Sequence, residues 1–461
     1  MAGRPAYISG MVGERDTIYA PATAAGRASI AVVRISGPRA GAALEALTAR
    51  PPPQPRHATR ARFIDPGSGE AIDEGLVLWF SRPRSFTGED VAELHLHGSR
   101  AVLSAALAAL AAMPGLRLAA AGEFTRRAFD AGKLDLAEVE GLADLIAAET
   151  EAQRRQALRQ LSGELGRLTE AWRDRVMRAL ARAEAEIDFP DEDVPGGMIA
   201  ALGPVLADIA AEIRNHLDDN RRGERLRDGV QVAIVGPPNA GKSSLLNRLA
   251  RREAAIVSAT AGTTRDVVEV QLDLAGYPVV VADTAGLRDL EGNSTAQDEI
   301  EREGMRRALA RAQTADLKIL VLDATQAGVD PAVCALADAN TLVVANKIDV
   351  APAAPELAGC RVWGISAKTG MGLDGFMAEL AREVMQRLGG VDTAAPAVTR
   401  ARHREALVEC VAALERARGG REAELIAEDL RLASRALGRI TGRVGVEDVL
   451  DLIFREFCIG K

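Results

Sequence analysis

A glycine-rich segment carries the clearest chemical signal in this sequence. Gly236-Pro-Pro-Asn-Ala-Gly-Lys-Ser243 has the spacing GxxxxGK[ST], follows an apolar run at 230–235 and precedes a run of leucines at 245–249. A strand, loop and helix in this order bind nucleotide phosphates. The loop amides and the helix N-terminus surround the phosphates, Lys242 neutralises their charge, and the Ser243 hydroxyl holds Mg²⁺. The sequence therefore predicts a nucleoside triphosphate site.

Further motifs identify the nucleotide. Asp283-Thr-Ala-Gly286 and Asn346-Lys-Ile-Asp349 each follow an apolar run, and Ser366-Ala-Lys368 comes later. The first supplies an acid of the Walker B type and a glycine amide beside the γ-phosphate. The Asp349 carboxylate can accept both the N1–H and the 2-amino protons of guanine, which adenine does not offer together. Ser366-Ala-Lys368 then closes over the base. This order favours GTP over ATP.

The segment Gly262-Thr-Thr-Arg-Asp266 lies where a first switch belongs, and Thr264 is the candidate second hydroxyl ligand of Mg²⁺. The residues that we predict to bind GTP are therefore Asn239, Ala240, Gly241, Lys242, Ser243, Ser244, Ser258, Ala259, Thr260, Ala261, Gly262, Thr263, Thr264, Asp283, Thr284, Ala285, Gly286, Asn346, Lys347, Asp349, Ser366, Ala367 and Lys368.

The hydrolytic mechanism needs an additional group. Many regulatory GTPases place a water-positioning glutamine directly after the DTAG motif, but this position is Leu287 and no arginine finger is identifiable. The polar segment from Ser258 to Thr263, together with Asn239, offers oxygen atoms to a monovalent cation beside the γ-phosphate. A K⁺ ion there would supply the positive charge that an arginine finger otherwise supplies.

Length and composition limit the possible architectures. The chain has 461 residues, 48% of them hydrophobic and 26% charged, with a net charge of -8. This length suggests roughly three folded domains. The acidic balance excludes a general basic coat, so RNA contact would need a local patch and DNA is not an expected partner. Four cysteines without a CxxC pair indicate a reducing cytoplasm, and we expect no membrane segment.

The pattern of apolar and polar residues changes along the chain. Strand-like runs at 29–35, 75–80 and 91–97 with a helical run at 102–113 indicate a small α/β domain. From about 134 to 225 and again from about 399 the pattern is helical, and between them strands alternate with helices, which predicts a parallel sheet wrapped by helices. The two helical blocks can pack together around an inserted middle domain. The Arg-rich segment 221–227 is compatible with a solvated linker.

These motifs carry a family resemblance. The set GPPNAGKSS, AGTTRD, DTAGLR, DEIEREG, NKID and SAK resembles the TrmE-type GTPases. Segments outside the nucleotide motifs extend the resemblance to the MnmE (TrmE) family over nearly the whole chain: DTIYAPAT, VVRISG, SFTGEDVAELHLHG, GEFTRRAFDAGKLDLAEVEGLADLI, AEAEIDFPDE and the terminal FCIGK.

The resemblance implies a multidomain fold. The expected parts are an α/β N-terminal domain that binds tetrahydrofolate and dimerises, a discontinuous all-α helical domain, and an inserted Ras-like P-loop G domain; we place them at 1–131, at 132–226 with 390–461, and at 227–389. It also implies a homodimer that forms a heterotetramer with the FAD-carrying flavoprotein MnmG. Together they would add carboxymethylaminomethyl or aminomethyl groups at C5 of the wobble uridine of certain tRNAs, using 5-formyl- or methylene-tetrahydrofolate.

The resemblance also assigns site residues, at the positions that match the family's motifs. The resemblance assigns K⁺ to Asn239, Ser258, Thr260 and Thr263, and Mg²⁺ to Ser243 and Thr264. It assigns the catalytic, water-orienting carboxylate to Glu301. The loop at 289–297 is longer than we expect for the family, so Glu299 and Glu303 remain alternatives.

The folate residues of the family fall on Arg34, Glu93, Lys133 and the C-terminal Lys461. A carboxylate such as Glu93 suits the adjacent N–H and amino groups of a reduced pterin, and cations suit the glutamate tail. The terminal cysteine, suspected in the family of a catalytic role, falls on Cys458; a buried apolar role is the alternative.

A second function stays open on the residues alone. Ribosome-assembly GTPases of the Era or Der type share the AGTTRD motif and related phosphate loops. They append an RNA-binding KH domain or a second G domain, whereas this chain has no second phosphate loop and its C-terminal block is helical with an apolar stripe.

Overall fold

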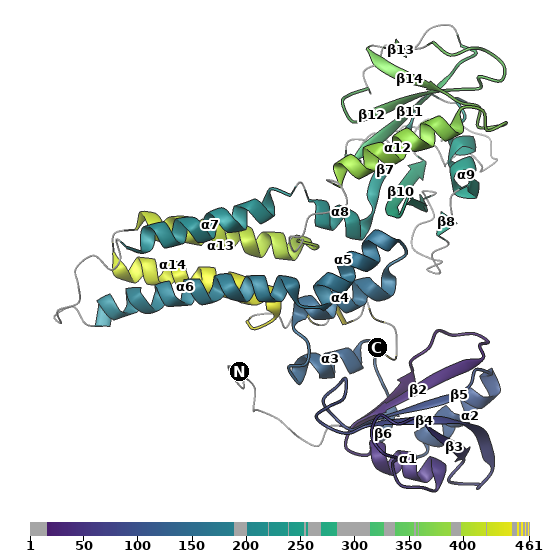
Figure 1. Ribbon diagram of the computed structural model, residues 1–461, viewed down its shortest axis with the longest axis vertical. Coiled ribbons are helices and arrows are strands. Elements are labelled where there is room, and N and C mark those ends of the chain that lie inside the picture. The colour runs from purple at the N-terminus through teal and green to yellow at the C-terminus, as the bar shows by residue number, and fades with distance from the viewer. Residues whose placement is uncertain are drawn as a thin grey trace, which may run out of the picture. The chain divides into compact units, whose positions relative to one another are not determined.

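The computed structural model describes residues 16–188, 201–219, 221–237, 239–252, 255–256, 269–283, 314–326, 337–354, 356–357, 359–388, 398–420, 422–444, 450, 453–454, 457 and 460. These form two compact units, residues 1–143 with 441–461 and residues 144–440. Figure 1 shows the helices and strands of each unit. Within the described residues, no helix combines the length and the apolar character that crossing a membrane requires.

The first unit is built on a six-stranded sheet in the order β3-β4-β5-β2-β1-β6. All neighbours pair antiparallel except β1 and β6, which run parallel. Its strands and helices are β1 Thr17–Pro21, β2 Ile30–Ser36, α1 Ala40–Thr48, β3 Thr59–Ile64, β4 Ala71–Phe80, β5 Val91–His97, α2 Arg100–Ala111, β6 Leu116–Leu118, α3 Glu123–Asp130 and α4 Leu136–Ala147, which continues into the second unit. The expected strands at 75–80 and 91–97 are present, and the expected first strand begins one residue late, at Ile30.

The two faces of this sheet bury different residues because side chains alternate along a strand. Val33 and Ile35 of β2 belong to the large core that α1 and α2 cover. Ile18 and Ala20 of β1 belong to a smaller cluster on the other side with Phe124 of α3. Arg34, between Val33 and Ile35, shares that second side, because its guanidinium lies against the Phe124 ring.

The nucleotide-type domain of the second unit is an eight-stranded sheet in the order β13-β14-β12-β11-β7-β10-β9-β8. The five strands from β14 to β10 run parallel, as the alternating pattern predicts. Its elements are β7 Val230–Val235, α9 Lys242–Arg252, β8 Ala255–Ile256, β9 Glu269–Leu274, β10 Tyr277–Asp283, β11 Leu317–Asp323, β12 Thr341–Asn346, β13 Glu356–Leu357, β14 Cys360–Gly364 and α12 Leu373–Arg387.

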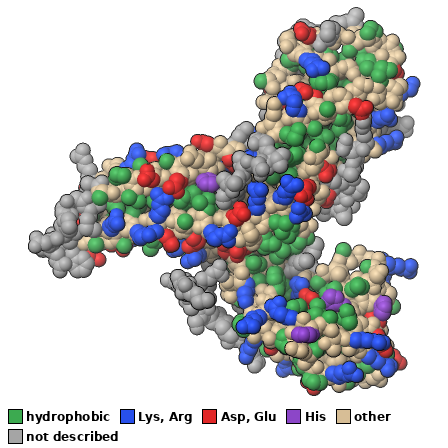
Figure 2. Space-filling model, viewed as in Figure 1, with side chains coloured by type: hydrophobic (Ala, Val, Ile, Leu, Met, Phe, Trp, Pro, Cys, Tyr) green, Lys and Arg blue, Asp and Glu red, His purple; other side chains and the backbone are tan. Residues whose placement is uncertain are grey.

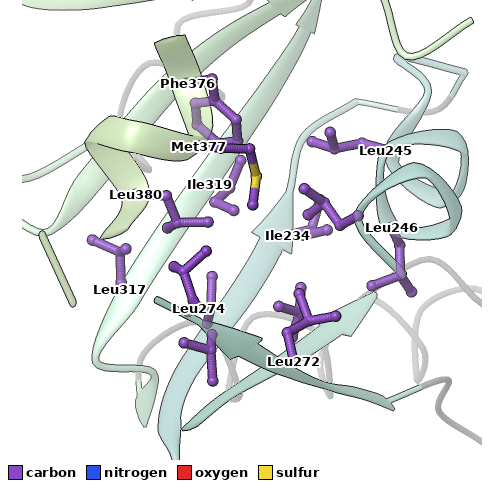
Figure 3. Close-up of a cluster of buried hydrophobic side chains, with 14 of the residues drawn as sticks. Ile234, Leu245, Leu246, Leu272, Leu274, Leu317, Ile319, Phe376, Met377 and Leu380 are labelled. Carbon is purple, nitrogen blue, oxygen red and sulfur yellow. The ribbon is translucent and has the colours of Figure 1, made fainter. Parts of the chain in front are cut away.

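Its main core lies where α9 and α12 pack on the sheet. Leucines of α9, central strand residues and the apolar face of α12 form one buried cluster (Figure 3). Ile234 and Ile319 in the two central strands are fully buried. Burial on this scale fixes the sheet whose strand ends carry the phosphate-binding segments.

The remaining helices of the second unit precede or follow the nucleotide-type domain in the sequence. They are α5 Glu151–Leu161, α6 Glu164–Asp188, α7 Leu202–Leu217, α8 Arg222–Asp228, α13 Ala401–Gly419 and α14 Ala423–Thr441. α7 packs against α13, with Arg214 paired to Glu415 at 2.5 Å, and α14 contacts α6, with Arg431 paired to Glu184 at 3.0 Å (Figure 1). Helical segments that the nucleotide-type domain separates in sequence therefore pack together.

Candidate functional site: a phosphate loop with base-side segments, and a separate charged pair

Two glycines allow the chain to form the loop after β7. Gly236 has φ +143°, and a Cβ there would lie 2.1 Å from the carbonyl oxygen of Val321. Gly241 has φ +94°, and a Cβ there would lie 2.1 Å from Nδ2 of Asn346. A side chain at either position is therefore excluded both by backbone conformation and by space.

Lys242, the first residue of α9, is buried at the base of this loop with 7% of its surface exposed. Its Nζ donates to the carbonyl oxygens of Gly236 at 2.9 Å and Pro237 at 2.8 Å. The ammonium group thus lies within the curve of the loop, where it can neutralise a bound phosphate. Ser243 and Ser244 follow on α9 and are exposed.

Asn346 joins the phosphate loop to the base-side segments. It ends β12 and is 3% exposed. Its Nδ2 donates to the carbonyl oxygen of Ala240 at 2.9 Å, and its Oδ1 accepts from the backbone N–H of Ala367 at 2.9 Å. One buried amide thereby joins the phosphate loop, 106 residues earlier in the sequence, to the segment at Ala367, 21 residues later. Asp349 and Lys368 are exposed beside them.

Lys347 makes a second bridge that depends on a residue absent from the sequence-based predictions. Its Nζ donates to the carbonyl oxygen of Asn239 at 3.0 Å and to Oδ2 of Asp323 at 2.6 Å. Although burial opposes its ionisation, hydrogen bonds from Lys347 and Thr325 lower the pKa of Asp323 to about 2. The available signal was an aspartate at the end of an apolar strand, the same signal that marked Asp283.

Several predicted nucleotide-site residues lie outside the described residues. Asp283 ends β10, but its side chain is not among the described parts of the structure. The others outside it are Ser258, Ala259, Thr260, Ala261, Gly262, Thr263, Thr264, Thr284, Ala285, Gly286 and Glu301.

The first unit holds a second constellation. Arg34 of β2 and Glu93 of β5 are direct cross-strand partners. Nε and Nη2 of Arg34 donate to Oε1 of Glu93 at 3.0 and 2.9 Å, and both side chains are less than one-fifth exposed. The guanidinium also lies 5.6 Å from the ring centre of Phe86 and 5.7 Å from that of Phe124. Sequence reasoning missed these aromatic neighbours because they come from a loop and from α3.

Lys133 contacts the loop that supplies Phe86. Its Nζ donates to the carbonyl oxygen of Pro83 at 2.5 Å. At the other end of the chain, Gly460 lies against Pro21, where a Cβ would be 1.9 Å from the Pro21 carbonyl oxygen. Pro21 follows Ala20, which pairs with Arg34. Lys461 and Cys458 lie outside the described residues.

The Arg-rich segment 221–227 is not a solvated linker, contrary to the sequence-based interpretation. Residues 222–228 form α8, in which Glu224 is 5% exposed. Its carboxylate accepts from Nε of Arg404 at 2.7 Å and from Nε of Arg221 at 2.6 Å. Arg221, Arg225 and Arg227 each form an ion pair with a carboxylate of the same unit. Figure 2 likewise shows basic and acidic side chains intermixed over the helices of this unit.

The second unit contains a strand, a phosphate loop and a helix in a parallel sheet flanked by helices, with base-side segments hydrogen-bonded to the loop. An α/β unit precedes it in the sequence. These features define a multidomain P-loop nucleotide-binding protein. Two family models match the chain: "GTP-binding protein TrmE N-terminus" over residues 17–133 and "MnmE helical domain" over residues 136–458. The chain belongs to the MnmE family.

Curated relatives cover essentially the whole chain. A protein of Parvibaculum lavamentivorans named tRNA modification GTPase MnmE is 62% identical over 97% of this chain and 100% of its own length. One of the same name from Paramagnetospirillum magneticum is 57% identical over the same shares. Among solved structures, the G domain of the T. maritima FeoB iron transporter is 26% identical over 34% of this chain and 98% of that chain, with a TM-score of 0.23, too low to show a shared fold.

Proposed function

We propose that this chain hydrolyses GTP and that the hydrolysis cycle serves the modification of C5 of the wobble uridine in certain tRNAs, carried out in the cytoplasm with the flavoprotein MnmG. The observation that carries the proposal is the Asn346 bridge between the phosphate loop and the base-side segment at Ala367, in a chain of the MnmE family. Asp349 is proposed to select guanine; it lies three positions after Asn346 and is exposed.

Mass analysis of tRNA from a strain that lacks the gene tests this function. Loss of the C5-substituted wobble nucleosides, restored by the intact chain and not by Lys242→Ala, supports it. An altered ribosome profile with intact wobble nucleosides would instead favour a ribosome-assembly GTPase of the Era or Der type.

K⁺ is proposed to activate hydrolysis. Asn239 of the phosphate loop, with Ser258, Thr260 and Thr263, would hold the ion, which would supply positive charge beside the γ-phosphate. The main-chain oxygen of Asn239 accepts a hydrogen bond from Lys347 and the side chain is exposed, so the side-chain oxygen is the proposed ligand. Ser243 and Thr264 would hold Mg²⁺.

Comparing GTP turnover in KCl with turnover in NaCl at equal ionic strength tests the ion. We expect turnover to be at least about tenfold faster in KCl, since one stabilising charge contributes that much or more. Equal rates would remove K⁺ from the proposal and leave GTP hydrolysis standing.

Glu301 is the proposed water-orienting residue, with Glu299 and Glu303 as competitors. We expect Glu301→Ala to leave the dissociation constant for GTP within about twofold of the wild-type value and to lower turnover about 100-fold. Glu299→Ala and Glu303→Ala serve as matched controls. If one of these slows turnover and Glu301→Ala does not, the role passes to that neighbour.

The Arg34–Glu93 pair is the proposed folate site. Its support is a carboxylate and a guanidinium that are partly shielded from solvent, next to two aromatic rings, with Lys133 on the adjoining loop. A reduced pterin offers the two N–H groups that Glu93 can accept, and Lys133 and Lys461 suit an anionic tail. The proposal includes dimerisation through this N-terminal unit, which sedimentation of the intact chain would measure.

A further inference from the structure

One carboxylate, Asp144, joins the two segments that connect the nucleotide domain to the helices. Its Oδ1 accepts from Nε of Arg227 at 3.0 Å and from Nη2 of Arg400 at 2.8 Å. Arg227 lies in α8, directly before β7, whereas Arg400 directly precedes α13. Asp144 is 14% and Arg400 10% exposed, so this is a largely buried ion pair and is only weakly screened by solvent.

Helix α5 holds the same end of the sheet at a second point. The backbone N–H of Ala152 donates to the carbonyl oxygen of Gly276 at 3.1 Å, in the turn between β9 and β10. Nε2 of Gln153 donates to the carbonyl oxygen of Arg227 at 2.9 Å. The helices therefore contact the beginnings of β7 and β10.

The other ends of these two strands carry the nucleotide chemistry. β7 runs into Gly236 and the phosphate loop, and β10 ends at Asp283. The strands pair in parallel from Val230–Val279 onward, so they are held in one register. Strands of this length span about 20 Å, and a hydrogen-bonded pair of them connects the phosphate end to the Asp144 end as one rigid element.

Arg227 also has a second carboxylate partner and lies beside a cavity. Its Nη1 donates to Oδ1 of the exposed Asp228 at 2.8 Å. Beside it lies a cavity of about 100 Å³ lined by Asp144, Ala147, Gln153, Gln156, Arg227 and Asp228. One guanidinium that pairs with two carboxylates at once, beside a cavity, can lose one partner and keep the other, and this would provide the two discrete arrangements that coupling between distant sites requires.

We propose that Asp144 is a positioning residue that couples the nucleotide domain to the helical domain: the Arg227–Asp144 contact is made in one nucleotide state and lost in the other, in which Arg227 keeps only Asp228. Arg400 keeps Asp144 in place in both states. This inference rests on the proposed function, because it concerns how GTP hydrolysis reaches the modification reaction; Asp144 touches no substrate.

The test separates hydrolysis from its use. For Asp144→Asn, purified with its flavoprotein partner, we expect kcat and KM for GTP within about twofold of wild type. The yield of modified wobble uridine per GTP hydrolysed should fall roughly three- to thirtyfold. Asp144→Glu, which keeps the charge, should recover part of that yield. Asp208→Asn, a neutralised exposed aspartate on α7, should change neither quantity.

Two results would overturn the inference. One is an unchanged yield per GTP in Asp144→Asn; the other is a parallel loss of hydrolysis, yield and thermal stability, which would make Asp144 merely structural. If Asp144→Asn does not fold, Arg227→Gln, which leaves the Asp144–Arg400 pair, carries the same expectations. Failure of the wild-type chain to modify tRNA would count against the proposed function and not against this coupling.

Discussion

At the scale of single residues, the nucleotide site depends on a charge that holds two strained positions together. Asn239 and Lys347 both have positive φ, +59° and +70°, although neither is glycine. Such conformations persist where surrounding contacts impose them. Here the Lys347 ammonium group links the Asn239 carbonyl oxygen to Asp323, whose Oδ1 also accepts from the Thr325 hydroxyl at 2.6 Å. Asp323 thus fixes the phosphate loop through Lys347.

Removing this carboxylate should weaken nucleotide binding. We expect Asp323→Ala to raise the dissociation constant for GDP about tenfold, the worth of a charge-assisted hydrogen bond, and Asp323→Asn to raise it less. Titration calorimetry measures both. Asp338→Asn is the matched control, because Asp338 pairs with Lys318 at 2.7 Å between the same two strands, at their opposite ends. An equal effect of both variants would show a loss of sheet stability and not of positioning.

At the scale of elements, α8 is fixed by an ion-pair cluster. Although burial opposes its ionisation, hydrogen bonds from Arg404 and Arg221 hold the pKa of Glu224 below its usual range. Arg404 also donates to Oδ1 of Asp219 at 2.7 Å and to the carbonyl oxygen of Leu217 at 2.7 Å. Helix α13 is thereby linked to the end of α7 and to α8, the helix that leads into β7.

This cluster predicts a pH-dependent stability. At neutral pH, Glu224→Gln should lower the unfolding free energy of the second unit by about 2 kcal/mol, because two arginines lose a nearly buried charged acceptor. The folded-state pKa lies below the unfolded value of about 4.3. The advantage of the wild type is therefore complete above that value and is lost as the pH falls through the folded-state pKa. Calorimetric midpoints of both proteins at neutral and acidic pH measure this; a pH-independent gap would contradict it.

At the scale of the whole molecule, the two candidate sites lie in different compact units. Arg34 and Glu93 belong to the first unit and Lys242 to the second. Each site is completed by contacts inside its own unit: cross-strand pairing with aromatic neighbours in one, and the Asn346 and Lys347 bridges in the other. Ligand binding at one site should therefore survive the loss of the other.

Reciprocal variants test this independence. Lys242→Ala should lower GTP turnover at least about 100-fold, because the phosphate charge loses its cation. It should leave binding of 5-formyltetrahydrofolate unchanged. Glu93→Gln should weaken folate binding about tenfold, since a charged acceptor becomes a neutral one, with GTP turnover unchanged in the absence of tRNA. Equilibrium dialysis and phosphate release provide the two measurements, and loss of both activities in either variant would contradict separate sites.

The sequence by itself determined the elements and the chemistry that depends on local spacing. The parallel strands, the phosphate loop with Lys242, and the positions of Asn346 and Asp349 after one strand all follow from apolar periodicity and glycine placement. The pattern also separated the α/β unit from the helical blocks. These features are encoded within one strand–loop–helix segment at a time, and local rules therefore reach them.

Only the tertiary structure decided which distant residues meet. Asp323 with Lys347, Phe124 with Arg34, and Arg227 and Arg400 with Asp144 come from segments far apart in the chain. The Arg-rich segment 221–227 looked solvated because Asp144, which pairs with Arg227, and Arg404, which pairs with Glu224, lie far away in the sequence. Ion-pair partners are set by strand order and helix packing, which depend on the burial of the whole core, and a linear pattern of charges does not contain that information.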